Sequence, residues 1–205
     1  MDRKRIGLWQ RFGAWFYDFA MWPLEVLAAR RWREALWQGV EGKVLEIAVG
    51  TGAGFLAHPP GVEVVGVDAS AAMLARAGRR AARLGLEVEL VQADLHHLPF
   101  PDHGFDFVVG SFVLCSVYRP VAALGELRRV IRPGGELRLL EHVRPRGRRL
   151  AKLLSILAPH FAKTTWELFP HGGWELLEER DLDRPGMVRL YRAVPDGIRP
   201  TSGGR

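Results

Sequence analysis

Residues 43–54 read KVLEIAVGTGAG, and this stretch gives the strongest indication of the fold. Its first half, 43–48, has the length and apolar content of a buried strand, and glycines follow at positions 50, 52 and 54. Glycine lets the backbone turn tightly and lets a ligand approach it closely. Because open parallel sheets bind ligands at the carboxyl ends of their strands, the stretch predicts a strand that runs directly into a ligand-binding loop.

Outside this stretch, short apolar segments alternate with segments of helical pattern. Strands are expected at 62–67, 87–92, 106–111, 136–141, 174–181 and 187–194. Helices are expected at 8–37 (interrupted at Pro23), 71–84, 120–131 and 148–162, with Pro133-Gly134-Gly135 as a stop after the third. Strands that alternate with helices form a mostly parallel sheet covered on both faces, so an α/β fold is expected.

The length and composition limit the organisation of the chain. With 205 residues, of which 48% are hydrophobic, it is long enough for one domain and short for two. We expect one domain over 1–194, with a helical cap over about 1–40 and a flexible tail over 195–205. No apolar run is long enough for a membrane-spanning helix, and the basic N-terminus lacks the pattern of a signal peptide, so a cytoplasmic location is expected. A single cysteine, Cys115, excludes an intrachain disulfide and a cysteine-rich metal site.

Charge is unevenly distributed along the chain, whose formal net charge is +6. Residues 1–33 and 128–149 are basic, whereas residues 34–127 are acidic. A basic flank can contact nucleic acid or anionic lipid, or it can be a solvated face. The excess of arginine over lysine and the absence of asparagine suit a thermophile, although a GC-rich genome would also favour arginine.

Two classes of ligand compete for the glycine loop. A dinucleotide-binding loop would carry a third glycine at the position of Phe55, so a dehydrogenase is disfavoured. No Gly-Lys-Ser/Thr follows, so a phosphate loop of the Walker type is excluded. Glu46, four residues before Gly50, suits a cationic ligand better than a pyrophosphate, for example a sulfonium that also carries an amino group.

Carboxylates follow the next two strands. Asp68 ends the second strand, where it could accept hydrogen bonds from both hydroxyls of a ribose, and Asp94 follows the third, where it could accept one from an adenine amino group. Each carboxylate has a simpler alternative role that involves no ligand. Asp68 could serve as a helix cap, and Asp94 could serve in an Asx-turn. His96 and His97, beside Asp94, are expected to be solvated in a loop.

Four motifs carry a family resemblance: VLEIAVGTGAG, VVGVDAS, QADLHHLPFPDHGFDFVVGSFVL and LRRVIRPGGELRLLEHV. In this order they resemble the motifs of class I S-adenosylmethionine-dependent methyltransferases, in particular the type-11 methyltransferase domain, over roughly residues 43–143. The resemblance implies a Rossmann-like, doubly wound sheet of seven strands. The sheet would be mostly parallel, with one antiparallel strand near the C-terminus and helices on both faces.

The resemblance also implies the cofactor, S-adenosyl-L-methionine, with S-adenosyl-L-homocysteine as product, and it implies no metal. The cofactor-binding residues that it implies are Tyr17, which would close on the cofactor, Glu46, Ala48, Gly50 and Gly52 at the methionine end, Asp68 and Ala69 at the ribose, Asp94 and Leu95 at the adenine, and Ser111 near the methionine end. Ala48 departs from the family pattern, because many members have glycine there.

The methyl acceptor is less well defined. The last two motifs are similar to those of alkyl-thiol methyltransferases, phospholipid N-methyltransferases and quinone C-methyltransferases, which implies in-line methyl transfer to a small, apolar or lipid-like acceptor. A nucleic-acid methyltransferase and a non-catalytic cofactor-binding module remain alternatives. His142 is a candidate base or acceptor-orienting group and equally a structural histidine; no catalytic residue is assigned. Segments 8–22 and 146–161 could cap the acceptor pocket and contact a membrane surface, or could pack on the sheet. The oligomeric state stays open.

Overall fold

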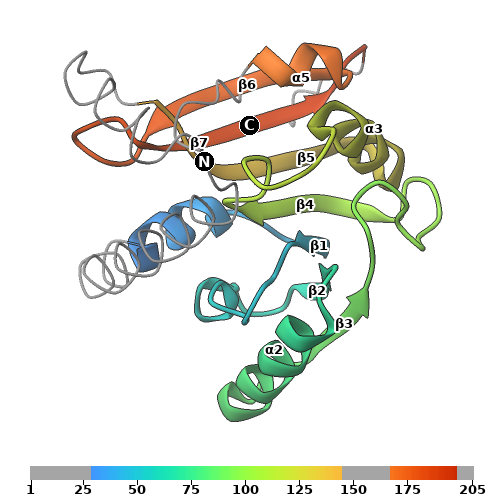
Figure 1. The fold of residues 1–205 in the computed structure, drawn as a ribbon, viewed down its shortest axis with the longest axis vertical. Coiled ribbons are helices and arrows are strands. Elements are labelled where there is room, and N and C mark those ends of the chain that lie inside the picture. The colour runs from blue at the N-terminus through green and yellow to red at the C-terminus, as the bar shows by residue number, and fades with distance from the viewer. Residues whose placement is uncertain (1–28, 145–166, 198–205) are drawn as a thin grey trace, which may run out of the picture.

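A computed structural model describes residues 29–144 and 167–197 of the chain (Figure 1). Residues 29–37 are helical. The other elements are β1 (Lys43–Ile47), η1 (Phe55–Ala57), β2 (Glu63–Asp68), α2 (Ala71–Leu84), β3 (Val88–Gln92), β4 (Phe105–Ser111), α3 (Pro120–Val130), β5 (Ile131–His142), α5 (Leu168–His171), β6 (Trp174–Asp181) and β7 (Val188–Pro195). All seven expected strands are present, and α2 has the expected bounds.

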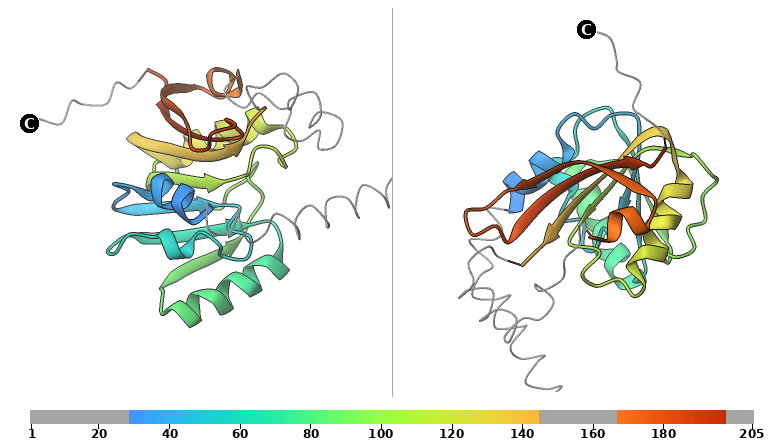
Figure 2. Two further views of the ribbon diagram at one scale, coloured as in Figure 1. Left: turned by 90° about the vertical axis from the view of Figure 1, so that its left-hand side faces the viewer. Right: turned by 90° about the horizontal axis from the view of Figure 1, so that it is seen from above.

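The seven strands form one sheet in the order β3-β2-β1-β4-β5-β7-β6 (Figures 1 and 2). Neighbours from β3 to β5 are parallel, and β7 runs antiparallel to both β5 and β6. The expected sheet with one antiparallel strand is therefore confirmed. The strand order reverses at β1, since β2 lies on one side of it and β4 on the other, and ligands of open α/β sheets bind at such a switch point.

Helices cover both faces of the sheet. On one face, Val44 of β1 lies in a buried cluster with Trp37 from the helical residues 29–37, and α2 packs against β3 on this face too. On the opposite face, Leu45 of β1 is buried with Leu127 of α3 and Phe169 of α5. The alternation of side chains along β1 directs successive residues to opposite faces, so a strand apolar along its whole length is buried from both sides.

Arg138 of β5 fastens the helical residues 29–37 to the sheet. Its guanidinium donates hydrogen bonds to the carbonyls of Leu36 and Gln38, where the helix ends, and lies 5.1 Å from the centre of the Phe107 ring. Its Nε donates to Glu136 at 2.6 Å. A cation at a helix C-terminus satisfies carbonyls that have no partner within the helix. This attachment fixes Trp37, which contacts the candidate site.

The start of β5 differs from expectation. The sequence Pro133-Gly134-Gly135 is not a break between helix and strand, because α3 ends at Val130 and β5 begins at Ile131. Ile131 pairs with Phe105, and the register then shifts so that Glu136 pairs with Phe107. Gly134, with φ 83°, accommodates the extra residues in this irregular stretch. The turn-forming residues therefore produce a bulge inside the strand.

Several expectations fall on residues outside the described ranges: the first part of helix 8–37 with Tyr17, the helix at 148–162, and both proposed caps. The described structure continues beyond the expected domain end at 194, since Pro195 ends β7 and Arg128 forms a 2.7 Å ion pair with Asp196. Within residues 29–144 and 167–197, no helix has the length and apolar character needed to cross a membrane.

Candidate functional site

The carboxyl ends of β1 to β4 bring the predicted site residues to one edge of the sheet. The loops that leave these strands contain Ala48, Gly50 and Gly52 after β1, Ala69 after β2, and Asp94 with Leu95 after β3, while Asp68 and Ser111 end β2 and β4. These four strands are consecutive neighbours in the sheet, in the order β3-β2-β1-β4. The fold therefore gathers the predicted residues of the described chain, from four separate stretches of sequence, around the switch point at β1.

The glycine loop has the backbone geometry that its glycines predict. Gly50 and Gly52 have φ values of 55° and 74°, in the left-handed region. The Gly52 N–H donates to the carbonyl of Val49 at 2.9 Å, and a Cβ at Gly52 would lie 2.6 Å from the Phe55 ring. A side chain is therefore excluded at Gly52 by both strain and space, and the loop presents bare backbone toward the sheet edge.

Asp68 links the glycine loop to α2. Its Oδ2 accepts a hydrogen bond from the Gly50 N–H and its Oδ1 accepts one from the Ser70 N–H, both at 2.9 Å. The cap of α2 is Ser70, whose hydroxyl accepts from the Met73 N–H. Asp68 is therefore not itself the capping residue of α2. A carboxylate offers about four lone-pair positions, so each oxygen keeps one for a ligand hydroxyl.

Ala48 adopts a conformation that explains why glycine is common at this position of the family pattern. Its φ is 51°, which costs a residue with a Cβ about 1–2 kcal/mol. Glycine would remove this strain at an entropic cost of about 0.4–1 kcal/mol in the unfolded chain. We expect Ala48→Gly to raise the free energy of unfolding by up to about 1.6 kcal/mol, measured by urea denaturation.

The control is Ala82→Gly, at an exposed position of α2, where glycine should lower stability by about 1 kcal/mol. Losses of equal size at both positions would show that the backbone at Ala48 is not strained.

The loop after β3 is closed by His96, which is not simply solvated as expected. The Asp94 Oδ1 accepts from the His96 backbone N–H at 2.9 Å and from the ring Nδ1 at 2.6 Å. The ring Nε2 donates to the carbonyl of Tyr118, in the loop after β4. Asp94 thus forms an Asx-turn, which was the simpler of its two expected roles. Its side chain nevertheless stays 66% exposed beside the carboxyl ends of the strands.

The two contacts of the His96 ring predict a pH dependence. Both partners are acceptors, so both ring nitrogens donate only in the imidazolium, and the hydrogen bond to Asp94 raises the pKa of His96. The backbone hydrogen bond from His96 lowers the pKa of Asp94. The stabilisation by His96 is therefore complete below about pH 6.5 and disappears as the pH rises through its folded-state pKa. The contribution of Asp94 disappears below about pH 3.9, as the pH falls through its own folded-state pKa.

We expect the difference in stability between wild type and His96→Ala to be largest between about pH 4 and pH 6.5 and to shrink toward pH 9. Urea denaturation across this range measures it, with His97→Ala, at an exposed neighbouring position, as control. A difference that grows with rising pH would contradict the bridge.

The loop after β4 is held by a buried carboxylate from β5. Glu141 is 0% exposed, and its Oε1 accepts from the N–H groups of Val113 and Leu114 at 3.0 and 2.8 Å. Phe112, with φ 58°, stacks on His142 at 4.0 Å between ring centres. Glu141 therefore fixes the end of the site beside Ser111, where the two stacked rings add a flat, partly apolar surface.

Beneath the glycine loop lies a pair that sequence reasoning missed. Glu46, on β1, is 5% exposed, and its Oε2 lies 2.9 Å from Nε2 of His58. His58 follows η1 and has no recognisable motif around it, so only the fold reveals that it meets Glu46.

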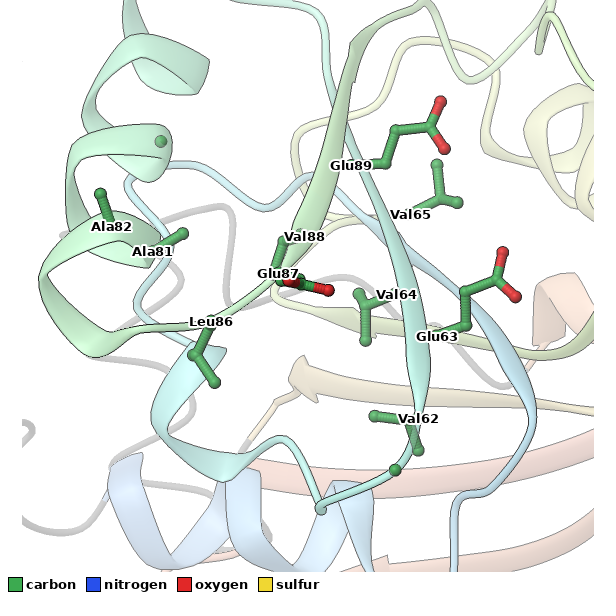
Figure 3. A pocket seen from close by; sticks show the side chains of 12 residues that line it. Val62, Glu63, Val64, Val65, Ala81, Ala82, Leu86, Glu87, Val88 and Glu89 are labelled. Atoms are coloured by element: carbon green, nitrogen blue, oxygen red, sulfur yellow. The ribbon is translucent and has the colours of Figure 1, made fainter.

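A cavity among the described residues lies away from this site. It has a volume of about 750 Å³ and lies between the amino ends of β2 and β3 and the end of α2 (Figure 3). Val62, Val64, Leu86 and Val88 contribute apolar walls, and Glu63 and Glu89 stand on the strands beside them. Because the glycine loop leaves the opposite end of β1, which is parallel to β2, this cavity is not part of the candidate site.

Comparisons with known proteins agree with this geometry. Residues 45–139 match a family described as a methyltransferase domain. The chain is 32% identical to the ubiquinone/menaquinone biosynthesis C-methyltransferase of Geobacter sulfurreducens over 202 residues, which cover 91% of this chain and 77% of that protein.

Two further relatives match over a shorter range. The phosphatidylethanolamine N-methyltransferase of Cereibacter sphaeroides is 39% identical over 128 residues, 62% of this chain and 63% of that protein. The demethylmenaquinone methyltransferase of Thermus thermophilus is 40% identical over 136 residues, 63% of this chain and 62% of that protein. The chain thus spans less than two thirds of the length of these two relatives.

Solved structures share the fold. A methyltransferase from Aquifex aeolicus, described as SAM dependent, superposes with a TM-score of 0.65 at 20% identity, covering 78% of this chain and 88% of that one. The PH0226 protein from Pyrococcus horikoshii superposes with a TM-score of 0.67 at 19% identity, covering 85% and 92%. At these identities the likeness bears on the fold alone.

Proposed function

The chain belongs to the class I S-adenosylmethionine-dependent methyltransferases with a type-11 domain, and on this premise we propose that it methylates a small, apolar or lipid-like acceptor. The main support for the proposal is the pair of hydrogen bonds that the Asp68 carboxylate accepts from the N–H groups of Gly50 and Ser70. It places a carboxylate with remaining acceptor capacity beside bare glycine backbone at the switch point of the sheet. Relatives named as quinone and phospholipid methyltransferases support the acceptor class.

The residues present fit this cofactor. The free lone pairs of Asp68 suit the two ribose hydroxyls, and the absence of side chains at Gly50 and Gly52 lets a ligand approach the backbone. Asp94, held by His96, offers its exposed carboxylate to an amino group. The buried carboxylate of Glu46 favours a cation above the loop. We propose these roles for the described residues, and we retain Ala48, Ala69, Leu95 and Ser111 as further contacts.

When bound, the cofactor supplies an electrophilic methyl group on a sulfonium. The part left to the protein is to align donor and acceptor and to exclude water. Asp68 and the glycine loop would fix the donor end. The loop held by Glu141 would form the wall on the acceptor side, where the stacked rings of Phe112 and His142 suit a flat or apolar acceptor. His142 would contact the acceptor there, and its role as a base depends on whether the reacting atom must lose a proton.

Calorimetry with S-adenosylmethionine and S-adenosylhomocysteine tests the cofactor half of the proposal. A transfer screen with methyl-labelled cofactor tests the acceptor half, with demethylated quinones, phosphatidylethanolamine vesicles, alkyl thiols and transfer RNA as separate arms. We expect cofactor binding, and methyl transfer in one of the first three arms. Absence of binding by folded protein would overturn the proposal, and transfer to RNA alone would replace the acceptor class.

A further inference from the structure

The buried pair of Glu46 and His58 lies directly below the proposed cofactor site. Their side chains are 6% and 4% exposed, and the Glu46 Oε2 lies 2.9 Å from the His58 Nε2. An ionised carboxylate only accepts hydrogen bonds, so the ring nitrogen that faces it carries a proton. A buried carboxylate is costly unless it is paired, and His58 provides a partner for Glu46 at 2.9 Å.

Three contacts fix the orientation of the His58 ring. Its centre lies 4.3 Å from the Trp37 ring, on the helical residues 29–37, and 5.1 Å from the Phe55 ring, on η1. The His58 backbone N–H donates to the carbonyl of Phe55 and ends η1. A ring held by two aromatic neighbours and its own backbone has little freedom to turn away from Glu46, so the carboxylate is held in one place.

Glu46 in turn supports the glycine loop from below. A Cβ built on Gly54 would lie 2.3 Å from the Glu46 Oε1, so the carboxylate packs against the backbone of this loop. One oxygen faces the loop and the other faces His58. With so little exposed surface, Glu46 influences a ligand through the loop and through its charge. The same carboxylate also has an electrostatic interaction with the Arg33 guanidinium.

We propose that His58 is a positioning residue of the cofactor site. By holding the Glu46 carboxylate against the underside of the glycine loop, it sets the shape of the loop and keeps a negative charge below the cationic end of the cofactor. This inference rests on the proposed function. It adds a residue that lies outside the glycine motif and does not itself touch the cofactor.

The test measures S-adenosylmethionine affinity by calorimetry in His58→Phe, His58→Gln, Glu46→Gln and the double variant His58→Phe/Glu46→Gln. Phenylalanine keeps the ring contacts and removes the donor, and glutamine keeps a donor. We expect affinity to fall about tenfold in His58→Phe, as for the partial loss of a charge-assisted hydrogen bond, and to recover in His58→Gln. In the Glu46→Gln background, His58→Phe should have little further effect, because His58 acts through Glu46.

His171→Phe is the matched control, because it makes the same substitution at an exposed histidine. His171 ends α5, which is followed by β6, an outer strand of the sheet. Thermal unfolding of each variant identifies losses that come from misfolding. If the wild type binds the cofactor and folded His58→Phe binds it equally well, the inference fails while the proposed function stands. Additive effects in the double variant would also overturn it. A wild type that does not bind would overturn both.

Discussion

Replacement of Asp68 by alanine should weaken S-adenosylmethionine binding about 100-fold, the loss expected for two hydrogen bonds to a charged group. In the structure this carboxylate already accepts from the Gly50 and Ser70 N–H groups, and its remaining lone pairs would accept from the ribose hydroxyls. The variant therefore loses both a ligand contact and the link between the glycine loop and α2. Calorimetry measures the change in affinity, and S-adenosylhomocysteine should be affected equally because it shares the ribose.

Glu63→Ala is the control for this experiment. Glu63 lies at the other end of β2, where it forms an exposed ion pair with Lys43. Such surface pairs contribute at most about 1 kcal/mol to the free energy of unfolding. Because Glu63 lies at the other end of β2 from the proposed site, this variant should keep its affinity for the cofactor. Unchanged cofactor affinity in a folded Asp68→Ala protein would remove the central residue of the proposed site.

Replacement of Glu141 by leucine should lower the free energy of unfolding by about 3 kcal/mol, because two buried N–H groups would lose their acceptor. These groups belong to Val113 and Leu114, which are 0% and 1% exposed, so water is poorly placed to substitute for the carboxylate. The strained backbone at Phe112 should then relax, and the stacking on His142 should be lost with it. Urea denaturation measures the loss of stability.

Methyl transfer by Glu141→Leu should fall further than cofactor affinity does, since the affected loop lies on the acceptor side. Glu141→Gln keeps an acceptor oxygen and should recover part of the stability. Glu175→Leu, the same substitution at an exposed position of β6, should change stability by less than about 0.5 kcal/mol. Equal stability of Glu141→Leu and Glu175→Leu would show that the carboxylate does not hold this loop.

Periodicity and turn residues predicted most of the fold. The apolar strands and the helix 71–84 could be located because their patterns repeat locally, and the glycines at 50 and 52 could be recognised because a left-handed backbone requires them. The pattern predicts the start of β5 at residue 136, which is wrong, because Gly134 serves equally in a turn and in a bulge. Only the pairing of Ile131 with Phe105 distinguishes the two.

The sequence pattern alone predicts the family, the order of the strands along the chain, and residue types that suit a charged nucleoside ligand. It could not assign partners to those residues. The pairing of Glu46 with His58, of Glu141 with the backbone after β4, and of His96 with Tyr118 depends on which loops meet at the carboxyl edge of the sheet. Hydrogen bonds act over about 3 Å, whereas these partners are separated by 12 to 28 residues, so only the tertiary structure decides them.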